Sequence, residues 1–445
     1  MSNESPLASS DTVIVLAQAL TGLGHLRVSH ALFHGLPPGA HALLLSSQDE
    51  SVNSIHALTS IHPALRNIME FTQRGWAEDV FTILARKYFR RQTKLITEQL
   101  QTILEEHVTK PKTLLVVATH MILGHQLAAM KDAFAKANNI RMVLIVVVTD
   151  DSPQHFWAVG GADLIFVPSE YTKRSLEAYH KSQLDLPKSQ YVVLPYMVSP
   201  NLGVSLSEQG YRRRVHQLDP AKLATIHMAI PVSGAAVQLT YFEKLISELD
   251  RHTDRFMFHI ISQQSPSTTT FLGHMIGKPN VKLHVSSSHR EVVELFESLY
   301  EYEVISLEVT KPSEQAFKAL LKPRERGGSV LLFSDPVGRQ EWDNIRFLTR
   351  HHLLPDKEEQ EELWREAARG KKPTDTLLLR AKTWRALRLP VHSLISAQFI
   401  GWCLEHKIFA SMVRFTGYMD SPELSSKGVE QFWKKVGEYL TILGY

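Results

Sequence analysis

The sequence contains a single cysteine, Cys403, among its 445 residues. A lone cysteine excludes an internal disulfide and any cysteine cluster for zinc or iron–sulfur ligation, and it favours a reducing cytoplasm as the compartment. Long apolar runs are lacking too, because no stretch approaches the roughly 20 residues of a membrane-spanning helix. Residues 1–10 have neither a basic start nor an apolar core. They do not resemble a signal peptide, and we expect a short disordered tail.

A large excess of charge of one sign is also lacking. The formal net charge of +3 is too small to indicate nucleic-acid binding. With 44% hydrophobic and 21% charged residues, the composition is that of a globular soluble protein. The length exceeds what one hydrophobic core usually supports, so we expect two domains.

Short apolar runs separated by helix-length segments recur along the chain. In the first half they span residues 12–17, 42–45, 113–118, 141–149, 163–167 and 191–194, and in the second half 223–230, 256–261, 281–285, 304–309 and 329–333. This rhythm predicts an α/β fold with two Rossmann-like domains, each a parallel sheet with helices on both faces. We expect domains at 11–205 and 222–390, a linker near 199–221, and helices at 391–445 that pack across the domains.

The first candidate site follows the opening strand. Gly22 and Gly24 lie in a turn before a helix, where backbone N–H groups can approach an anion or a sugar oxygen. His25 follows them, and a neutral imidazole there can accept a proton near pH 7. A dinucleotide-binding fingerprint is excluded because the third glycine is missing. A tight structural turn is an equally good explanation of the glycines.

The second candidate site follows the apolar run at 141–149. It brings Asp150, Asp151 and His155 to the rim of the sheet, where Asp150 is expected to orient His25 or to act as a base itself. Each acid has an alternative role in capping a turn or helix. Ser169 is predicted to cap the next helix. The adjacent acids lack the spacing of a metal–nucleotide motif, so we predict no metal site and no cofactor.

The third and fourth candidate sites lie in the second half, again where strands end and helices begin. Small residues at Ser233 and Gly234 allow close approach of a ligand, although plain helix–sheet packing explains them equally well. Two further turns offer N–H groups and positive charge to a phosphate, while ordinary helix capping is the alternative. Their candidate donor-site residues are Lys311, Ser313, Glu314, Gln315, Gly338, Arg339, Gln340 and Asn344.

A basic cluster within a predicted helix from about residue 76 to 107 is the last feature. Its members are Arg86, Lys87, Arg90, Arg91 and Lys94, with two aromatic residues between them. Such a face can rest on anionic lipid headgroups. An ordinary solvated helix surface is the alternative.

Four of these segments together resemble one family. They are GLGHLRVSHAL at 22–32, VVTDDSPQHFWAVGGADLIFVPSEYTKRSL at 147–176, VLPYMVSP at 193–200 and PVGRQEWDN at 336–344. Their sequences and order resemble the GT-B glycosyltransferases that include monogalactosyldiacylglycerol synthase, diacylglycerol glucosyltransferases and MurG. The family has a Gly-Pro-Gly-Thr-like turn at the donor site, where this chain has Lys311-Pro312-Ser313-Glu314.

The resemblance implies an amino-terminal acceptor domain, a carboxyl-terminal nucleotide-sugar domain, a cleft between them and a final helix that crosses back. It places His25 near the reacting centre, Lys311 to Gln315 at the donor diphosphate, and Gln340 and Asn344 on the donor. The expected activity is inverting, metal-independent transfer of a sugar from a nucleoside diphosphate, UDP in the first instance, to a lipid or other hydrophobic acceptor. The alternatives are a nucleotide-sugar-binding or regulatory protein without transfer, and an epimerase or hydrolase.

Overall fold

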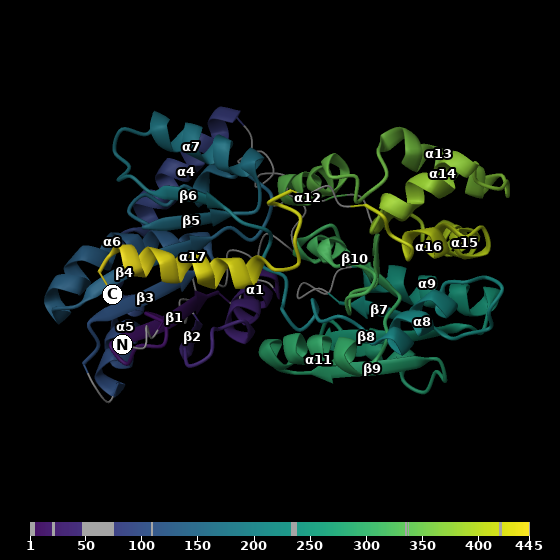
Figure 1. The fold of residues 1–445 in the computed structure, drawn as a ribbon, viewed down its shortest axis with the longest axis horizontal. Coiled ribbons are helices and arrows are strands. Elements are labelled where there is room, and N and C mark those ends of the chain that lie inside the picture. The colour runs from purple at the N-terminus through teal and green to yellow at the C-terminus, as the bar shows by residue number, and fades with distance from the viewer. Residues whose placement is uncertain are drawn as a thin grey trace. The chain divides into compact units, whose positions relative to one another are not determined.

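The computed structural model describes residues 5–19, 23–46, 75–107, 110–232, 238–333, 336, 338–417 and 421–444. The chain divides into two compact units. The first comprises residues 1–200 together with 427–445, and the second comprises residues 201–426. Each unit is built around its own sheet (Figure 1).

The sheet of the first unit has the order β2-β1-β3-β4-β5-β6, and all neighbouring strands are parallel. Its central strands are fully buried because helices cover both faces, which explains their uninterrupted Val, Ile and Leu. The strands are β1 (Thr12–Gln18), β2 (Ala42–Ser46), β3 (Thr113–Ala118), β4 (Arg141–Val147), β5 (Leu164–Val167) and β6 (Gln190–Val193).

The helices of the first unit are α1 (Leu23–His34), α4 (Gly75–Phe89), α5 (Lys94–Glu106), α6 (Met121–Asn138), the 3₁₀ turn η1 (His155–Trp157), α7 (Glu170–Ser182) and α17 (Gly428–Ile442). The chain returns to this unit through α17. The Trp433 indole donates to the Leu32 carbonyl at 2.9 Å. A Cβ at Gly428 would lie 2.4 Å from the carbonyl oxygens of Pro195 and Tyr196, so the close approach at the start of α17 requires glycine.

The sheet of the second unit has the order β12-β11-β10-β7-β8-β9 and is also parallel throughout. Counted from its own first strand, this is the order 6-5-4-1-2-3 of a doubly wound dinucleotide-binding fold. The strands are β7 (Ile226–Pro231), β8 (Phe256–Gln263), β9 (Val281–Ser286), β10 (Leu307–Thr310), β11 (Ser329–Leu332) and β12 (Ala386–Arg388).

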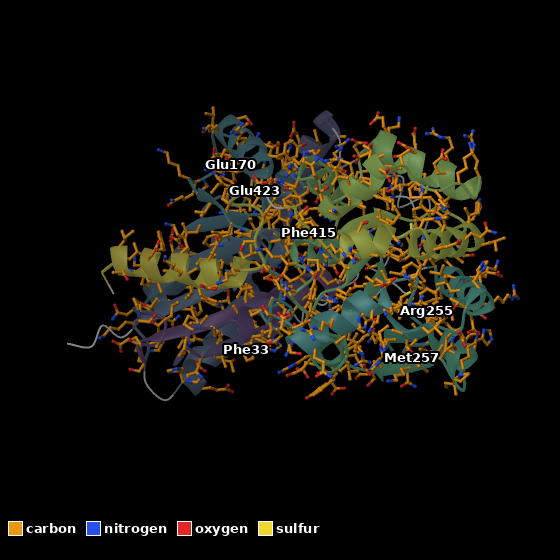
Figure 2. All side chains as sticks on the ribbon, turned by 45° about the vertical axis from the view of Figure 1, so that its right-hand side comes forward. Phe33, Glu170, Arg255, Met257, Phe415 and Glu423 are labelled. Atoms are coloured by element: carbon orange, nitrogen blue, oxygen red, sulfur yellow. The ribbon has the colours of Figure 1, made fainter. Side chains whose placement is uncertain are left out.

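Helices cover this second sheet as well. They are α8 (Glu208–Gln217), α9 (Leu239–His252), α10 (Thr269–Met275), α11 (His289–Tyr302), η2 (Glu314–Leu320), α12 (Gly338–Arg350), α13 (Lys357–Ala368), α14 (Asp375–Arg380), η3 (Ala381–Thr383), α15 (Ser393–Glu405) and α16 (Ile408–Met412). The segment after α16 is tied back by Glu423, which lies 2.8 Å from the His351 ring at the end of α12; Figure 2 labels Glu423.

The predicted α/β fold with two parallel sheets is confirmed, and each predicted apolar run contains a strand. Among the strands of the described residues, β12 alone was not predicted, because three residues are too few for a periodic signal. The segment predicted as a linker contains α8, which belongs to the second unit. Helices α15 and α16 belong to the second unit and α17 to the first. Among the described residues, no helix combines the length and apolar composition needed to cross a membrane.

Candidate functional site

His25 lies at the point where the strand order of the first sheet reverses. Strands β2 and β3 flank β1 on opposite sides, and ligands of parallel α/β sheets bind at the carboxyl ends of strands beside such a reversal. The His25 Nδ1 lies 2.7 Å from the Thr119 carbonyl oxygen, just after β3, and 3.3 Å from the Thr149 hydroxyl. A carbonyl only accepts, so Nδ1 carries the hydrogen and the lone pair of the ring is on Nε2. That tautomer is the one a general base requires.

Side chains that sequence analysis did not single out surround this imidazole. The His120 ring packs edge-on against it with centroids 4.6 Å apart, and the buried Trp157 ring lies at 6.4 Å. The Thr119 hydroxyl donates to the His25 carbonyl at 3.2 Å and shares a 2.8 Å hydrogen bond with Ser29. The sequence did contain a signal for Thr119 and His120. They directly follow the apolar run at 113–118, just as Asp150 directly follows the run at 141–149.

Asp151 is fully buried, and its carboxylate lies against the first turn of α7. It accepts hydrogen bonds from the hydroxyls of Ser169 and, at 2.9 Å, of Thr172. Ser169 caps α7 as predicted, since its hydroxyl accepts from the Thr172 N–H at 3.1 Å. The structure therefore favours the capping alternative for Asp151. Asp150 is half-buried and follows Thr149, and the Thr119 carbonyl orients the His25 ring through Nδ1.

His155 is held by two acids of α4. Its Nδ1 lies 2.7 Å from the Asp79 carboxylate, and its backbone N–H donates to Glu78 at 2.8 Å. The ring stacks on Tyr179 with centroids 4.0 Å apart. Burial raises the pKa of Tyr179 to about 12, so its hydroxyl stays protonated. These contacts give His155 a structural role in joining α4, η1 and α7.

In the second sheet the strand order reverses between β7 and β10, which places the donor-site candidates Lys311 and Asn344 beside the reversal. Lys311 follows β10, and its ammonium lies 3.8 Å from the Glu341 carboxylate of α12. The buried Asn344 amide donates to the Pro312 carbonyl at 3.2 Å. Helix α12 and the turn after β10 are thus joined by side-chain contacts.

The helix after this turn differs from the expectation. η2 is a seven-residue 3₁₀ helix without a side-chain cap from Ser313, so it offers a weaker helix dipole than an α-helix would. Its Glu314 is half-buried. Gln315 is 5% exposed, and its Nε2 has no hydrogen-bond partner within the described residues. Lys318 anchors η2 from below through a buried ion pair with Glu308 of β10.

Positive charge at the predicted diphosphate site is largely compensated. The Arg339 guanidinium lies 3.4 Å from the Asp343 carboxylate of its own helix, as Lys311 lies near Glu341. Gly338 opens α12 with φ of 73°, a conformation that favours glycine, and Gln340 is half-buried one turn before Asn344. The remaining candidates Gly22, Ser233 and Gly234 lie outside the described residues, and Gly24 opens α1.

The loop at 321–328, which replaces a short turn of the resembling family, is held by two buried arginines. Arg214 of α8 donates to the carbonyls of Ile305, Pro323, Glu325 and Arg326 at 2.5–2.9 Å. Arg385 donates to the Leu321 carbonyl at 2.8 Å and the Gly328 carbonyl at 3.1 Å. Burial lowers the pKa of Arg214 to about 9, and the neighbouring charge of Arg385 acts in the same direction. The backbone of the loop is therefore anchored to the packed interior, while the side chains of Lys322 and Arg324 are exposed.

The basic cluster is not one surface. The predicted helix from 76 to 107 is broken between α4 and α5, and Arg86 is 3% exposed with its guanidinium 3.0 Å from Asp185. Arg90 turns inward to donate to the Gly160 carbonyl at 3.2 Å. Lys87, Arg91 and Lys94 remain exposed. The prediction that all five basic residues share one surface is thus wrong, because the helix is broken, Arg86 is buried beside the Asp185 carboxylate and Arg90 donates to a backbone carbonyl.

Comparisons with known proteins bear on the fold. No family model matches the chain, and no curated protein matches it in sequence. The UDP-GlcNAc 2-epimerase of Neisseria meningitidis bound to UDP-GlcNAc superposes with a TM-score of 0.51 and 11% identity, over 96% of this chain and 100% of that one. MurG of Acinetobacter baumannii gives a TM-score of 0.44 and 9% identity, over 96% and 99%.

The likeness to the epimerase covers nearly the whole of both chains at low identity. Such a likeness concerns architecture and not chemistry. Together with the two parallel sheets and the helix that returns to the first unit, it shows that the chain has the GT-B fold.

Proposed function

We propose that this protein is an inverting glycosyltransferase that moves a sugar from a nucleoside diphosphate, UDP in the first instance, to a hydroxyl of a hydrophobic acceptor. The observation that carries the proposal is the orientation of His25. Its Nδ1 is 2.7 Å from the Thr119 carbonyl, which assigns the ring lone pair to Nε2, the tautomer that a general base at the carboxyl edge of the first sheet requires.

In the proposed reaction, Nε2 of His25 takes the proton of the acceptor hydroxyl as that oxygen attacks the anomeric carbon. The bond from the anomeric carbon to the donor phosphate oxygen breaks, and its electron pair leaves with the diphosphate. The Thr119 carbonyl stabilises the imidazolium that forms, because both ring nitrogens then carry hydrogen and Nδ1–H keeps its acceptor. Metal ions have no part in this step.

We assign nucleotide-sugar binding to the turns beside β7 and β10. Gln315 supports this assignment because a buried amide nitrogen without a partner in the described chain is costly and suits a ligand acceptor. Lys311, Arg339, Gln340 and Asn344 surround the same reversal of strand order. UDP is the first nucleotide to test because the N. meningitidis epimerase was solved with UDP-GlcNAc.

Two alternatives have specific support. The acids paired with Lys311 and Arg339 reduce the positive charge available to a diphosphate, which favours a protein that binds a nucleotide sugar without transferring it. The likeness to the epimerase supports epimerisation or hydrolysis of a UDP-sugar as the second alternative.

The hydrophobic acceptor of the proposed transferase is supported by exposed apolar side chains of α4, whose exposed fractions are 46% at Val80, 63% at Leu84 and 51% at Tyr88.

The test begins with calorimetry against UDP, UDP-glucose, UDP-galactose and UDP-GlcNAc, followed by mass-spectrometric and NMR analysis with diacylglycerol and small hydrophobic alcohols as acceptors. We expect a glycosylated acceptor of inverted anomeric configuration. His25→Ala should lower kcat by about 10²–10⁴-fold, the usual contribution of a general base, with donor affinity retained. His41→Ala, at an exposed histidine of the same unit, is the matched control.

Each other outcome has a distinct meaning. An unchanged kcat in His25→Ala would remove the assigned base. Binding without turnover of any acceptor would favour the non-catalytic alternative, and an epimerised or free sugar without an acceptor would favour epimerase or hydrolase activity. Failure to bind any of the four nucleotides would contradict the donor-site assignment.

A further inference from the structure

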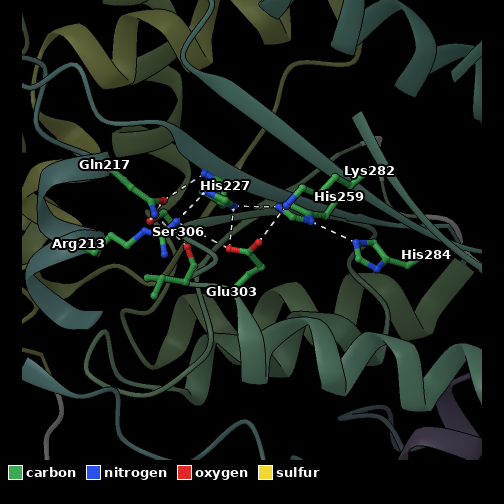
Figure 3. A network of polar contacts seen from close by, with 9 residues as sticks. Arg213, Gln217, His227, His259, Lys282, His284, Glu303 and Ser306 are labelled. Carbon is green, nitrogen blue, oxygen red and sulfur yellow. Dashed lines mark hydrogen bonds and ion pairs between the residues drawn. The ribbon is translucent and has the colours of Figure 1, made fainter. Parts of the chain in front are cut away.

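A second group of chemically active side chains lies in the second unit, away from the turns assigned to the nucleotide. Figure 3 shows His227 of β7, His259 of β8, His284 of β9 and Glu303, which follows α11, joined by hydrogen bonds and ion pairs. His227 is the second residue of β7, and Glu303 precedes β10. His227 and Glu303 therefore lie toward the amino-terminal side of this sheet, opposite the carboxyl ends at which the donor turns lie, while His259 and His284 lie progressively further along the sheet.

Three atoms of this group have the spacing of a metal-ligand set. The Nδ1 of His227 lies 2.9 Å from the Nε2 of His259 and 3.5 Å from a Glu303 carboxylate oxygen. All three ligand atoms lie within 4.8 Å of one another. Around a tetrahedral Zn²⁺ with bonds near 2.0–2.2 Å, neighbouring ligand atoms are about 3.3 Å apart. The two distances from the His227 Nδ1 are close to this value, and the His259–Glu303 separation has to shorten when an ion binds.

We propose that His227, His259 and Glu303 form a binding site for a divalent transition metal of the Zn²⁺ class, with a fourth position open to water. Two imidazoles and one carboxylate are ligands that Zn²⁺ accepts, and they leave one negative charge to oppose the cation. The site is independent of the proposed transferase chemistry.

The surroundings hold two of the ligands in the orientation that this role requires. With His259 bound through Nε2, its Nδ1–H donates to the His284 Nε2, 3.2 Å away. The second oxygen of Glu303 accepts from the Lys282 ammonium at 3.1 Å. Such second partners fix the tautomer of a metal-bound imidazole and the rotation of a metal-bound carboxylate.

Gln217 fixes the backbone of the segments that carry the ligands. Its fully buried side chain accepts from the His227 N–H at 3.1 Å and from the Ser306 hydroxyl at 2.7 Å, and it donates to the Val304 carbonyl at 3.1 Å. The start of β7 and the chain directly after Glu303 are thereby held together. A site whose backbone is preassembled loses less conformational entropy on binding an ion.

Arg213 is the neighbour that has to adjust. Its guanidinium lies 3.3 Å from the Nε2 of His227, which carries a hydrogen once Nδ1 binds a metal, so two donors would face each other. The Arg213 side chain is 52% exposed and can turn into solvent. Arg213→Gln removes the repulsive charge and offers an amide oxygen to Nε2–H. This variant should bind the metal more tightly than the wild type.

The experiment uses full-length, tag-free protein stripped with a chelator. Zn²⁺ binding is measured by competition with a chromogenic chelator, and coordination is followed by the visible absorption of bound Co²⁺. We expect one saturable ion per chain, a tetrahedral Co²⁺ spectrum, and a rise in the melting temperature of about 5–10 °C at a hundredfold excess over Kd.

Variants decide where the ion binds. Glu303→Gln and His227→Gln should weaken binding by about 100-fold or more, and His284→Gln by about 10- to 100-fold, the usual effect of losing a second partner. Glu303 is 22% exposed, so its amide variant tests the site even if the histidine variants fail to fold. His274→Gln, at an exposed histidine elsewhere in the second unit, is the control and should bind as the wild type does.

The assignment would be overturned by the lack of saturable binding to the wild type. It would also be overturned if Glu303→Gln retained wild-type affinity, or if Arg213→Gln bound the metal more weakly, because the ion would then lie elsewhere.

Discussion

Replacing Arg214 by methionine tests whether the 321–328 loop depends on a buried guanidinium. The side chain is 1% exposed and makes four hydrogen bonds to carbonyl oxygens at 2.5–2.9 Å. Hydrogen bonds to a charged group contribute about 1.5–3 kcal/mol each, or roughly 6–12 kcal/mol for four. Burying the charge costs several kcal/mol, and methionine avoids this cost. We expect a net loss of about 3–5 kcal/mol in the free energy of unfolding.

The assay is differential scanning calorimetry of the full chain, followed through the transition of the second unit. For a unit of this size, about 1 kcal/mol shifts the melting temperature by about 2–4 °C, so Arg214→Met should lower it by about 6–20 °C. Arg212→Met is the matched control because Arg212 lies in the same helix and is exposed. Arg214→Lys keeps the charge with fewer donors and should fall between the two. Equal melting temperatures for Arg214→Met and Arg212→Met would refute the reasoning.

Two further predictions concern the first unit. Burial lowers the pKa of the buried His125 from 6.5 to about 3, with a smaller effect in the same sense from Arg90 and Arg86 and an opposing one from its hydrogen bond to the Phe156 carbonyl. The unfolded chain therefore takes up this proton first, and stability that is complete above pH 6.5 is lost between about 6.5 and 3. Urea unfolding at pH 7 and 5 should show a loss about 2 kcal/mol larger in the wild type than in His125→Gln, and parallel losses would contradict the assignment. Exposed Lys87 lies in α4 with that helix's exposed apolar side chains, and exposed Arg91 and Lys94 follow it in the chain, so we propose reversible binding to anionic vesicles. Replacing these three by Gln should abolish co-sedimentation, whereas replacing the exposed Lys434 and Lys435 of α17 should not; equal binding by both variants would exclude this face.

Sequence periodicity predicted the sheets well because parallel strands buried on both faces leave long apolar runs. The run at Thr113–Ala118, for example, matches β3 residue for residue. Sequence periodicity predicted the ends of helices less well. The break between α4 and α5 carries no proline or glycine, so nothing local marked it, and tertiary contacts of Arg86 and Arg90 fix it instead.

For the candidate sites, strand ends located the right edges but not the partner of each side chain. The Thr119 carbonyl, for example, accepts the Nδ1 hydrogen of His25, and the sequence did not predict this contact. Every residue supplies a carbonyl, so no residue type in the sequence signals a backbone acceptor. The compensation of Lys311 by Glu341 was likewise invisible, since it depends on how α12 is rotated against the turn after β10. The pair of Arg339 and Asp343 differs, because the two residues lie four positions apart in one helix, a spacing that itself predicts an ion pair.

The group of His227, His259 and His284 could have been predicted from the sequence if the order of the strands had been known. In the parallel register, His227 pairs with Met257, two residues before His259, and His259 pairs with Lys282, two residues before His284. Because side chains alternate between faces with a period of two, these offsets keep all three imidazoles on one face and step them diagonally across β7, β8 and β9. The pattern exists only once the strands are known to be neighbours in that order. Ligands of parallel sheets usually bind at the carboxyl ends of the strands, so a search directed there does not examine the histidine group. For that reason the prediction of no metal site rested on the Asp150-Asp151 pair.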